Sequence, residues 1–594
     1  MAVVRAAVDD RGGRRLDGRV DDWRGETSRI GGTTQVSKGE VVYQDHLFDD
    51  LGADIPGQRP PQHGTVGNPK GKYRYPEDTP ERRFMHNSAD IQELRLARQG
   101  GDIWLLARFS TLLQDDSTVI AFAFDTDGDA GTGGGVWPRG AGVSATGADI
   151  VATLWGTGGS ITSLADGAET PFHDVAVSTV DNSIEARLPL AALGGMHAVR
   201  VWAASGIWDP AAQTWMAPMY SNAALSPARA MNVGFRATET GSFMEEQQAA
   251  ALATGDITPF VANIDLDAKD ALFSVSPGHF YDVILDDGFA IEPEHEGVSY
   301  DGKPGRFPGV GGAALTQHFD FFGRYQPYGL YVPSTYDGVT VQPAALVLHG
   351  LGGSFSSYNS QPGFLRDMGE GLGNNGEHFA PMFLLTPLAR GSSFYADWGE
   401  AETMAVLRDV ESSFAPIDTE RVYLTGYSMG GYGVYRFASI HPDLFAAAAT
   451  WAGYTGEFTG SWVTAPVASG ARGKAGIGDP VDTLENVRSL PLLHLTGTND
   501  EIVPTAGQYA AARRLQELGY ESRWDLYAGY EHFSFALVDD WKQVRSWLGD
   551  RHRVTNPRTV DYRFSDGWTD ASADVAALGL VHDGAYWLHG LTMR

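Results

Sequence analysis

Apolar and polar residues alternate with a period of two through much of residues 90–235. The alternating runs are 91–110, 117–129, 149–165, 182–193 and 197–208, and Gly, Asp and Asn separate them. This period, with many β-branched and aromatic residues, is typical of strands that bury one face. Residues 1–240 are therefore predicted to form an antiparallel β-sandwich, with the Pro-, Gly- and Asp-rich residues 40–88 wrapped around it.

The pattern changes after residue 315, where apolar strands alternate with amphipathic helices. The expected strands are 328–333, 344–350, 383–388, 421–426, 446–453, 490–497 and 522–529. Such alternation predicts an α/β domain at 315–550, with a mostly parallel sheet and helices on both faces. Residues 241–314 are expected to be a connector with one helix at 244–254. Residues 551–594 return to β patterning and are expected to form a short terminal β segment.

One serine lies between a predicted strand and a predicted helix. Ser428 is the centre of the sequence GYSMG at 426–430. A sharp strand-to-helix turn strains the backbone of such a serine and exposes its oxygen, and it requires small residues two positions before and after. Ser428 is the predicted nucleophile, because a glycine-rich loop without function would not need these flanking elements.

An acid and a histidine follow at the ends of later strands. Asp500 comes after the strand 490–497, and His532 comes after the strand 522–529. The chain order Ser, acid, His predicts that His532 is the base and that Asp500 orients it. The alternatives are that Asp500 only caps a turn and that His532 is a surface loop residue. His494 lies inside an apolar strand and is interpreted as a buried residue.

An oxyanion hole needs two backbone N–H donors. Met429, which follows the nucleophile, is expected to supply one of them. The second is expected from Leu351, in the sequence HGLGG at 349–353, where Gly350, Gly352 and Gly353 allow close approach of the backbone. His349 is interpreted as a residue that shapes this loop.

Residues 320–550 resemble the α/β-hydrolases, specifically bacterial esterases related to polyhydroxybutyrate depolymerases, feruloyl esterases and prolyl-oligopeptidase-type catalytic domains. The sequences that carry the resemblance are LHGLGG, LTGYSMGGYG, LTGTNDEIVP and YEHFSF. The resemblance implies a serine hydrolase that forms an acyl-enzyme and needs no cofactor for catalysis. It leaves open an ester hydrolase for aryl esters or polyesters, a prolyl-oligopeptidase-type peptidase, and a non-catalytic protein that binds a glycan or polymer.

Two tryptophans are candidates for contact with the substrate. Trp451 ends the strand after the nucleophile helix, where α/β sheets bind ligands, and core packing is the alternative. Trp398 is the second candidate, whereas Tyr427 is expected to pack under the nucleophile turn. The loops 354–380 and 454–488 are expected to set the specificity.

The sequences LDGRVDDWRG at 16–25 and FDTDGDAGTGG at 124–134 resemble family-nine carbohydrate-binding and DOMON-like domains. Asp125, Asp127 and Asp129 have a spacing that suits one structural Ca²⁺. The alternative is a metal-free acidic turn, since Val136 stands where an EF-hand has its glutamate. Trp104, Trp137 and Trp155 could bind a glycan if they are exposed. Otherwise the sandwich is expected to be a scaffold or lid for the hydrolase.

Charge and composition restrict the possible partners. The net charge of −30 disfavours binding to nucleic acid or anionic lipid. The expected partner is a small-molecule or polymeric ester, as the resemblance to serine hydrolases implies. The absence of cysteine excludes disulfides and thiolate catalysis. No apolar stretch reaches the ~18 residues that span a bilayer. The resemblances predict a secreted or extracellular protein, although the sequence begins with no signal peptide.

Overall fold

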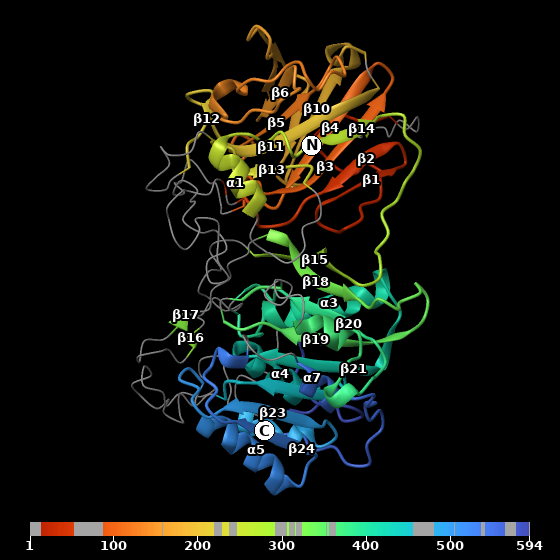
Figure 1. The fold of residues 1–594 in the computed structure, drawn as a ribbon, viewed down its shortest axis with the longest axis vertical. Coiled ribbons are helices and arrows are strands. Elements are labelled where there is room, and N and C mark those ends of the chain that lie inside the picture. Colours follow the sequence, from red (N-terminus) through yellow and green to blue (C-terminus); the bar gives the residue numbers. More distant parts are fainter. Residues whose placement is uncertain are drawn as a thin grey trace, which may run out of the picture. The chain divides into compact units, whose positions relative to one another are not determined.

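The computed structural model contains two compact units (Figure 1), and each is described by itself. One comprises Met1–Glu239 with Met244–Ser274, and the other comprises Thr240–Phe243 with Val275–Arg594. The described residues are 13–50, 52, 87–156, 158–195, 197–218, 228–236, 246–291, 306–307, 315–316, 323–351, 353–355, 364–391, 393–455, 480–503, 505–535, 541–564 and 578–592. Most of the predicted wrapping segment 40–88 and of the loop 454–488 lies outside these residues.

The first unit contains two antiparallel sheets. One has the order β1-β2-β3-β4-β10-β9, with strands Thr33–Ser37, Glu40–Gln44, Ile91–Gln99, Asp102–Phe109, Ser183–Pro189 and Val175–Ser178. The other has the order β12-β11-β5-β6-β7-β8, with strands Thr214–Trp215, Ala198–Asp209, Thr118–Phe124, Ile150–Trp155, Gly158–Ser163 and Glu169–Phe172. Short 3₁₀ helices lie at Pro138–Gly140 and Leu190–Leu193.

Side chains from both sheets form one apolar core. Leu94 and Leu105 of the first sheet belong to the same buried cluster as Phe122, Leu154 and Val201 of the second. Alternate residues of a strand point to opposite faces, so the period-two pattern supplies this core. The predicted antiparallel sheets are therefore present, and they share one apolar core, as the two layers of a β-sandwich would.

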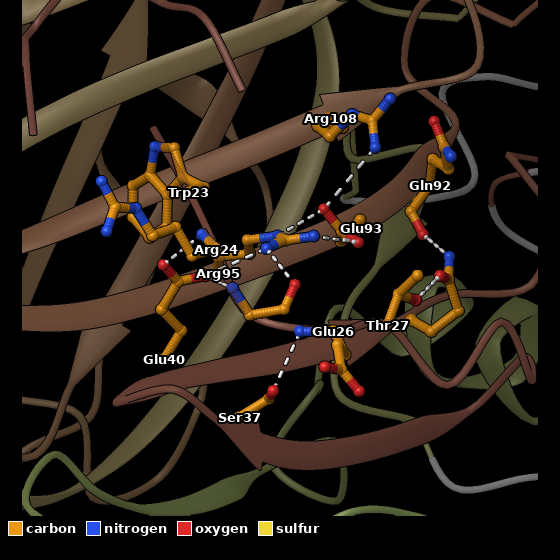
Figure 2. A network of polar contacts seen from close by, with 12 residues as sticks. Trp23, Arg24, Glu26, Thr27, Ser37, Glu40, Gln92, Glu93, Arg95 and Arg108 are labelled. Carbon is orange, nitrogen blue, oxygen red and sulfur yellow. Dashed lines mark hydrogen bonds and ion pairs between the residues drawn. The ribbon is translucent and has the colours of Figure 1, made fainter. Parts of the chain in front are cut away.

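A buried polar network joins strands β2 and β3 of the first sheet to the N-terminal segment (Figure 2). Arg95 donates to Glu93 and Glu40 over 2.6 and 3.0 Å, and the backbone N–H of Arg24 donates to Glu40 over 2.8 Å. Burial would raise the pKa of Glu93, but Arg95 and Arg108 hold it below its usual value. The hydrogen bonds and ion pairs of the network balance buried charges whose burial without partners would cost free energy.

The predicted connector is divided between the two units. Helix α1 (Glu246–Thr254) and strand β14 (Ala262–Asp265) belong to the first unit, because β14 pairs with β11. The two-residue strand β13 (Asn232–Val233) also pairs with β11. Strand β15 (His279–Ile291) instead extends the sheet of the second unit by pairing with β18.

The second unit is built on a mixed eight-stranded sheet. Its order is β15-β18-β20-β19-β21-β22-β23-β24, with β18 Gly323–Val332, β20 Phe383–Pro387, β19 Gln342–Leu348, β21 Ile417–Tyr427, β22 Ala447–Trp451, β23 Leu492–Gly497 and β24 Ser522–Tyr527. The strands from β20 to β24 are parallel, whereas β15 and β18 run antiparallel to their neighbours. All seven predicted strands are present, and β15 is an addition that the sequence did not indicate.

Helices connect these strands. They are α2 Phe364–Gly369, α3 Trp398–Ser413, α4 Met429–Ile440, α5 Thr505–Leu518 and α7 Lys542–Leu548, with 3₁₀ helices at Asn374–Gly376 and Pro480–Val487. A small two-stranded sheet, β16 (Arg306–Phe307) with β17 (Leu315–Thr316), completes the described elements. None of the helices within the described ranges is long and apolar enough to cross a membrane.

The expected terminal β segment differs from the structure. The described parts of it, 551–564 and 578–592, contain no strand, and Ala585 and Leu588 form only an isolated bridge. Side-chain and backbone contacts hold this segment instead, for example the hydrogen bond from Tyr586 Oη to the Pro442 carbonyl oxygen at 2.9 Å. The alternation of apolar and polar residues in this segment therefore does not produce strands in its described parts.

Candidate active site

Strand β21 and helix α4 place Ser428 in a sharp turn. Its φ of 58° and ψ of −113° lie in a strained region of backbone space for a non-glycine residue. A Cβ on Gly426 would lie 2.5 Å from the Gly430 carbonyl oxygen, and a Cβ on Gly430 would lie 2.0 Å from that of Leu348. Both flanking positions therefore require glycine, which is the geometry that the sequence GYSMG predicted.

The structure brings Ser428, His532 and Asp500 together. The Oγ of Ser428 lies 2.9 Å from Nε2 of His532, and Nδ1 of His532 lies 2.9 and 3.0 Å from the two carboxylate oxygens of Asp500. Ser428 is 9% exposed and His532 is 2% exposed. The arrangement is that of a nucleophile, a base and an acid that orients the base.

The turn after β23 holds Asp500 rigidly. Its Oδ1 accepts the backbone N–H groups of Ile502 and Val503 at 3.0 and 2.7 Å. Asp500 thus also makes the turn contacts considered as the alternative interpretation of this residue. The two roles coexist, because the turn contacts use Oδ1, whereas Oδ2 lies 2.9 Å from Nδ1 of His532.

Two further residues fix the loop that carries His532. The hydroxyl of Tyr427 donates to the His532 carbonyl oxygen at 2.8 Å, and its ring lies 5.0 Å from the imidazole. The backbone N–H of His532 donates to Oε2 of Glu501 at 3.1 Å. Tyr427 was expected only to pack under the turn. Neither of these contacts could be found from the sequence, because each joins segments that are distant along the chain.

The oxyanion loop lies against the nucleophile. A Cβ on Gly350 would lie 3.4 Å from Cβ of Ser428, so the loop after β19 approaches the serine closely. His349 is buried, and its two ring nitrogens each lie 2.8 Å from a carbonyl oxygen, those of Gly350 and Leu388. Burial lowers the pKa of His349, and the two carbonyl contacts let this ring shape the loop.

The donor residues themselves remain predictions. Met429 is the first residue of α4, and Leu351 follows Gly350 with its side chain exposed. Gly352 lies outside the described residues. The hydroxyl of Tyr395 donates to the His349 carbonyl oxygen at 2.9 Å and so supports the loop from below.

The two tryptophans proposed as substrate contacts are buried. Trp451 is fully buried, and its ring lies 5.4 Å from that of Phe535 and 4.6 Å from that of Trp541. Its carbonyl oxygen accepts the N–H of Ser428 at 2.9 Å. Trp398 is 4% exposed at the start of α3. Trp451 therefore packs in the core, which was the alternative interpretation of this residue, because Phe535 and Trp541 belong to the same buried cluster.

His494 is a buried strand residue, as interpreted from the sequence. Its Nδ1 lies 2.7 Å from the hydroxyl of Tyr435, and burial lowers the pKa of His494 to about 3. A histidine that stays neutral at this depth is not a rival to His532.

A second cluster of ionisable residues lies within the hydrolase unit. Oε1 of Glu400 lies 3.0 Å from Nε2 of His441 and 2.9 Å from Nε2 of His582, and Arg436 donates to Oε2 at 2.8 Å. Two imidazoles and a carboxylate could hold a transition metal. The guanidinium of Arg436 already balances the carboxylate charge, so the cluster fits a buried ion pair that joins α3, α4 and the C-terminal segment.

The acidic turn in the sandwich gathers a different set of carboxylates from the predicted one. Asp125, Asp127 and Asp149 converge, whereas Oδ1 of Asp129 accepts the N–H of Gly131 at 2.8 Å. Asp125 is buried and forms an ion pair with Arg200 at 2.7 Å, which partly balances the negative charge of its carboxylate. Every one of these carboxylates has a hydrogen-bond donor, as in a metal-free turn.

The tryptophans considered for glycan binding are mostly in the core. Trp104 and Trp137 are 5% and 1% exposed. Trp155 is partly exposed, but the guanidinium of Arg139 lies 4.4 Å from its ring and covers it. Trp104 and Trp155 lie on strands β4 and β6, where side chains alternate between the two faces, whereas Trp137 precedes the 3₁₀ helix Pro138–Gly140.

Residues 390–550 match the model of the prolyl oligopeptidase family. The match contains Ser428, Asp500 and His532. It covers a part of the second unit only, so the resemblance of the N-terminal region to carbohydrate-binding or DOMON-like domains stays a prediction. A search of curated proteins found no match.

Several solved structures are similar to this chain. A ferulic acid esterase from Anaeromyces mucronatus is 17% identical, with a TM-score of 0.28 over 38% of this chain and 86% of that one. An S-formylglutathione hydrolase from Staphylococcus aureus is 16% identical, with a TM-score of 0.30 over 46% and 99%. A thermostable esterase is 13% identical, with a TM-score of 0.31 over 77% and 98%. At these TM-scores the similarities carry no argument about substrate. The sheet order, the family match and the arrangement around Ser428 together support a serine hydrolase with the α/β-hydrolase fold.

Proposed function

We propose that this chain is a serine carboxyl-ester hydrolase that works through an acyl-enzyme. One observation carries the proposal: Ser428 Oγ, the His532 imidazole and the Asp500 carboxylate form a continuous chain of contacts of 2.9 Å. A serine hydroxyl is a weak nucleophile unless a neighbouring base removes its proton. The distance to Nε2 suits that proton transfer.

The reaction follows from this geometry in two halves. Oγ of Ser428 attacks the ester carbonyl carbon while Nε2 of His532 takes the hydroxyl proton. Asp500 stabilises the resulting imidazolium through Nδ1. The tetrahedral intermediate collapses, Nε2 returns the proton to the departing alcohol oxygen, and an acyl-serine remains. Water then attacks the acyl carbon with His532 again as the base, and the acid product leaves.

Charge on the former carbonyl oxygen needs two N–H donors. The amides of Met429 and Leu351 are the proposed pair, because Met429 opens α4 and Gly350 lies against Ser428. The helix N-terminus adds a favourable dipole at the same point. Removing one such donor in other hydrolases costs about a hundredfold to a thousandfold in turnover.

The substrate class is proposed as aryl esters or polyesters. A prolyl-oligopeptidase-type peptidase is the second candidate, and the family match over 390–550 favours it. The same catalytic residues would serve either reaction. A non-catalytic binding protein is the third candidate, and the strained backbone of Ser428 argues against it, because a binding scaffold has no need of that strain.

Three accompanying proposals concern the surroundings of the enzyme. Export is proposed from the sequence resemblances alone. Contact of the sandwich with a polymer or glycan is likewise a proposal. A structural Ca²⁺ in the sandwich would use Asp125, Asp127 and Asp149.

A hydrolysis panel tests the function. It compares short and long p-nitrophenyl esters, methyl ferulate, an aromatic polyester fragment and a Pro-containing peptide anilide. Ser428→Ala is the test variant, and Ser412→Ala on the exposed end of α3 is the matched control. Ester turnover that Ser428→Ala abolishes and Ser412→Ala retains supports the esterase. Cleavage of the anilide alone would assign a peptidase. Failure of Ser428 to react with a fluorophosphonate would point to a binding protein.

A further inference from the structure

An exposed aromatic side chain stands next to the catalytic histidine. Phe533 is 56% exposed, although it directly follows the buried His532. Two residues later, Phe535 is 1% exposed and packs against Trp451. The segment therefore anchors itself through Phe535 and leaves Phe533 facing solvent. Single exposed apolar side chains are common on protein surfaces, so the position of Phe533 beside His532, and not its exposure, carries the argument.

The ring of Phe533 lies next to the imidazole that would protonate the leaving group. Its centroid is 5.5 Å from the centroid of the His532 imidazole, with the two planes at 84°. Nε2 of His532 must come within hydrogen-bond distance of the alcohol oxygen to protonate it. A group attached to that oxygen therefore starts within reach of the ring, whereas the acyl group is held at the carbonyl carbon by Ser428.

The charge around this position selects further among alcohols. Oε2 of Glu501 accepts the N–H of His532 at 3.1 Å, and Glu531 is exposed one residue before His532. Hydrogen bonding to His532 lowers the pKa of Glu501, so its carboxylate is ionised at neutral pH. Because Glu501 contacts the His532 backbone and Glu531 directly precedes His532, the negative charge of this segment disfavours an anionic alcohol, through repulsion that salt screens.

We propose that Phe533 forms an apolar subsite for the alcohol part of the ester, and that this subsite selects neutral aryl or long-chain alcohols. The inference rests on the proposed ester hydrolase and adds to it the class of leaving group. The subsite acts on ground-state binding of a non-reacting group, so its loss changes KM more than kcat.

The experiment varies the alcohol and the acyl group separately. Wild type, Phe533→Ala and Phe533→Leu are compared on 2-naphthyl acetate, methyl acetate and a 2-naphthyl ester with a longer acyl chain. Val339→Ala is the matched control, because Val339 is 75% exposed in the turn before the amino end of β19. In Phe533→Ala, the ratio of kcat/KM for naphthyl over methyl acetate is expected to fall about tenfold, mainly through KM. Phe533→Leu keeps most of that ratio, and Val339→Ala keeps all of it.

The outcomes separate this inference from the proposed function. If Phe533→Ala lowers kcat/KM equally for naphthyl and methyl acetate, the alcohol subsite is overturned. It is also overturned if the loss of kcat/KM depends on the length of the acyl chain. Preference for a carboxylate-bearing naphthyl ester over the neutral one overturns its charge selection. If wild type cleaves no ester, the proposed function fails, and the subsite is then tested through Ser428 labelling by a fluorophosphonate. Protection by 2-naphthol that Phe533→Ala loses supports the subsite, and protection that is unchanged, or absent in wild type, overturns it.

Discussion

Glu400 is expected to be the most sensitive charged residue of the hydrolase unit. Its carboxylate is fully buried and meets Arg436, which is 2% exposed, and His582, which is fully buried. Glu400→Gln keeps the shape of the side chain and removes its charge. Arg436 then loses the buried carboxylate that balances its charge, and the new amide must turn its NH2 group toward either the guanidinium or the two imidazole nitrogens.

The expected destabilisation follows from the burial of both partners. Breaking a buried ion pair by removing one charge typically costs about 3–5 kcal/mol. For a unit of about 320 residues, with an unfolding entropy of roughly 2.1 cal/mol/K per residue, that corresponds to a fall in Tm of about 4–7 °C. An exposed pair would cost only about 0–1 kcal/mol, so the magnitude distinguishes the two situations.

The assay must report on the hydrolase unit alone, since a two-unit chain need not unfold in one step. The fraction of Ser428 that still reacts with a fluorophosphonate is measured against temperature and against urea. Glu411→Gln is the matched control, because Glu411 lies exposed on the same helix, α3. A change of less than about 1 kcal/mol in Glu400→Gln, or one no larger than in the control, would refute the buried-pair reasoning.

Acid should remove the same stabilisation in wild type. Burial would raise the pKa of Glu400, but His582 and Arg436 hold it well below its usual value near 4.5. A carboxylate with a lowered folded pKa contributes stability above its unfolded pKa and loses it as pH falls through the folded pKa. The difference between wild type and Glu400→Gln is therefore expected to be constant from pH 6 to 8 and to shrink below about pH 4.5. A difference that grows in that acidic range would contradict the sign of the shift.

Three further variants test the active site. Asp500→Asn can still accept the N–H groups of its turn but presents a donor to Nδ1 of His532, so kcat is expected to fall about a thousandfold or more with little change in Tm. Tyr427→Phe loses the hydrogen bond to the His532 carbonyl oxygen, which is expected to cost about 1 kcal/mol of stability and to lower kcat more than it changes KM. Gly430→Ala places a Cβ 2.0 Å from the Leu348 carbonyl oxygen and is expected to abolish labelling of Ser428.

Each of these expectations has an opposing result. Wild-type turnover in Asp500→Asn would mean that the carboxylate only supports its turn. Tyr427→Phe is compared with Tyr509→Phe, whose ring is 47% exposed on α5, and an equal effect in both would remove any role for Tyr427 in positioning His532. Full labelling in Gly430→Ala would show that the turn can widen without loss of its geometry.

Local sequence was sufficient for the strands and for the nucleophile turn. The period-two runs gave the sandwich strands, because alternate residues point to opposite faces and only one face is buried. The short apolar runs gave the seven strands of the hydrolase sheet. The glycines around Ser428 could be assigned a role from spacing alone, since the collisions that they avoid involve Gly430 and the end of the neighbouring strand.

The meeting of the three proposed catalytic residues was predictable, because in a parallel sheet the order of the strands along the chain determines which strand ends lie close together. Parallel strands end at one edge of the sheet, so residues that follow β21, β23 and β24 come together. Ser428, Asp500 and His532 are such residues. Trp451 also lies at the end of a parallel strand, but its side chain is buried. The rings of Phe535 and Trp541 pack against it, and the sequence does not indicate these contacts.

The tertiary structure alone decided contacts between segments far apart in the chain. Glu400 meets His582 across 182 residues, and Asp125 meets Asp149 rather than Asp129. The sequence also did not indicate that β15 would join the hydrolase sheet, or that Phe533 would remain exposed beside His532. Composition and periodicity report which faces are buried. The partner that each buried or exposed group meets depends on how those faces pack, and that packing is a property of the whole chain.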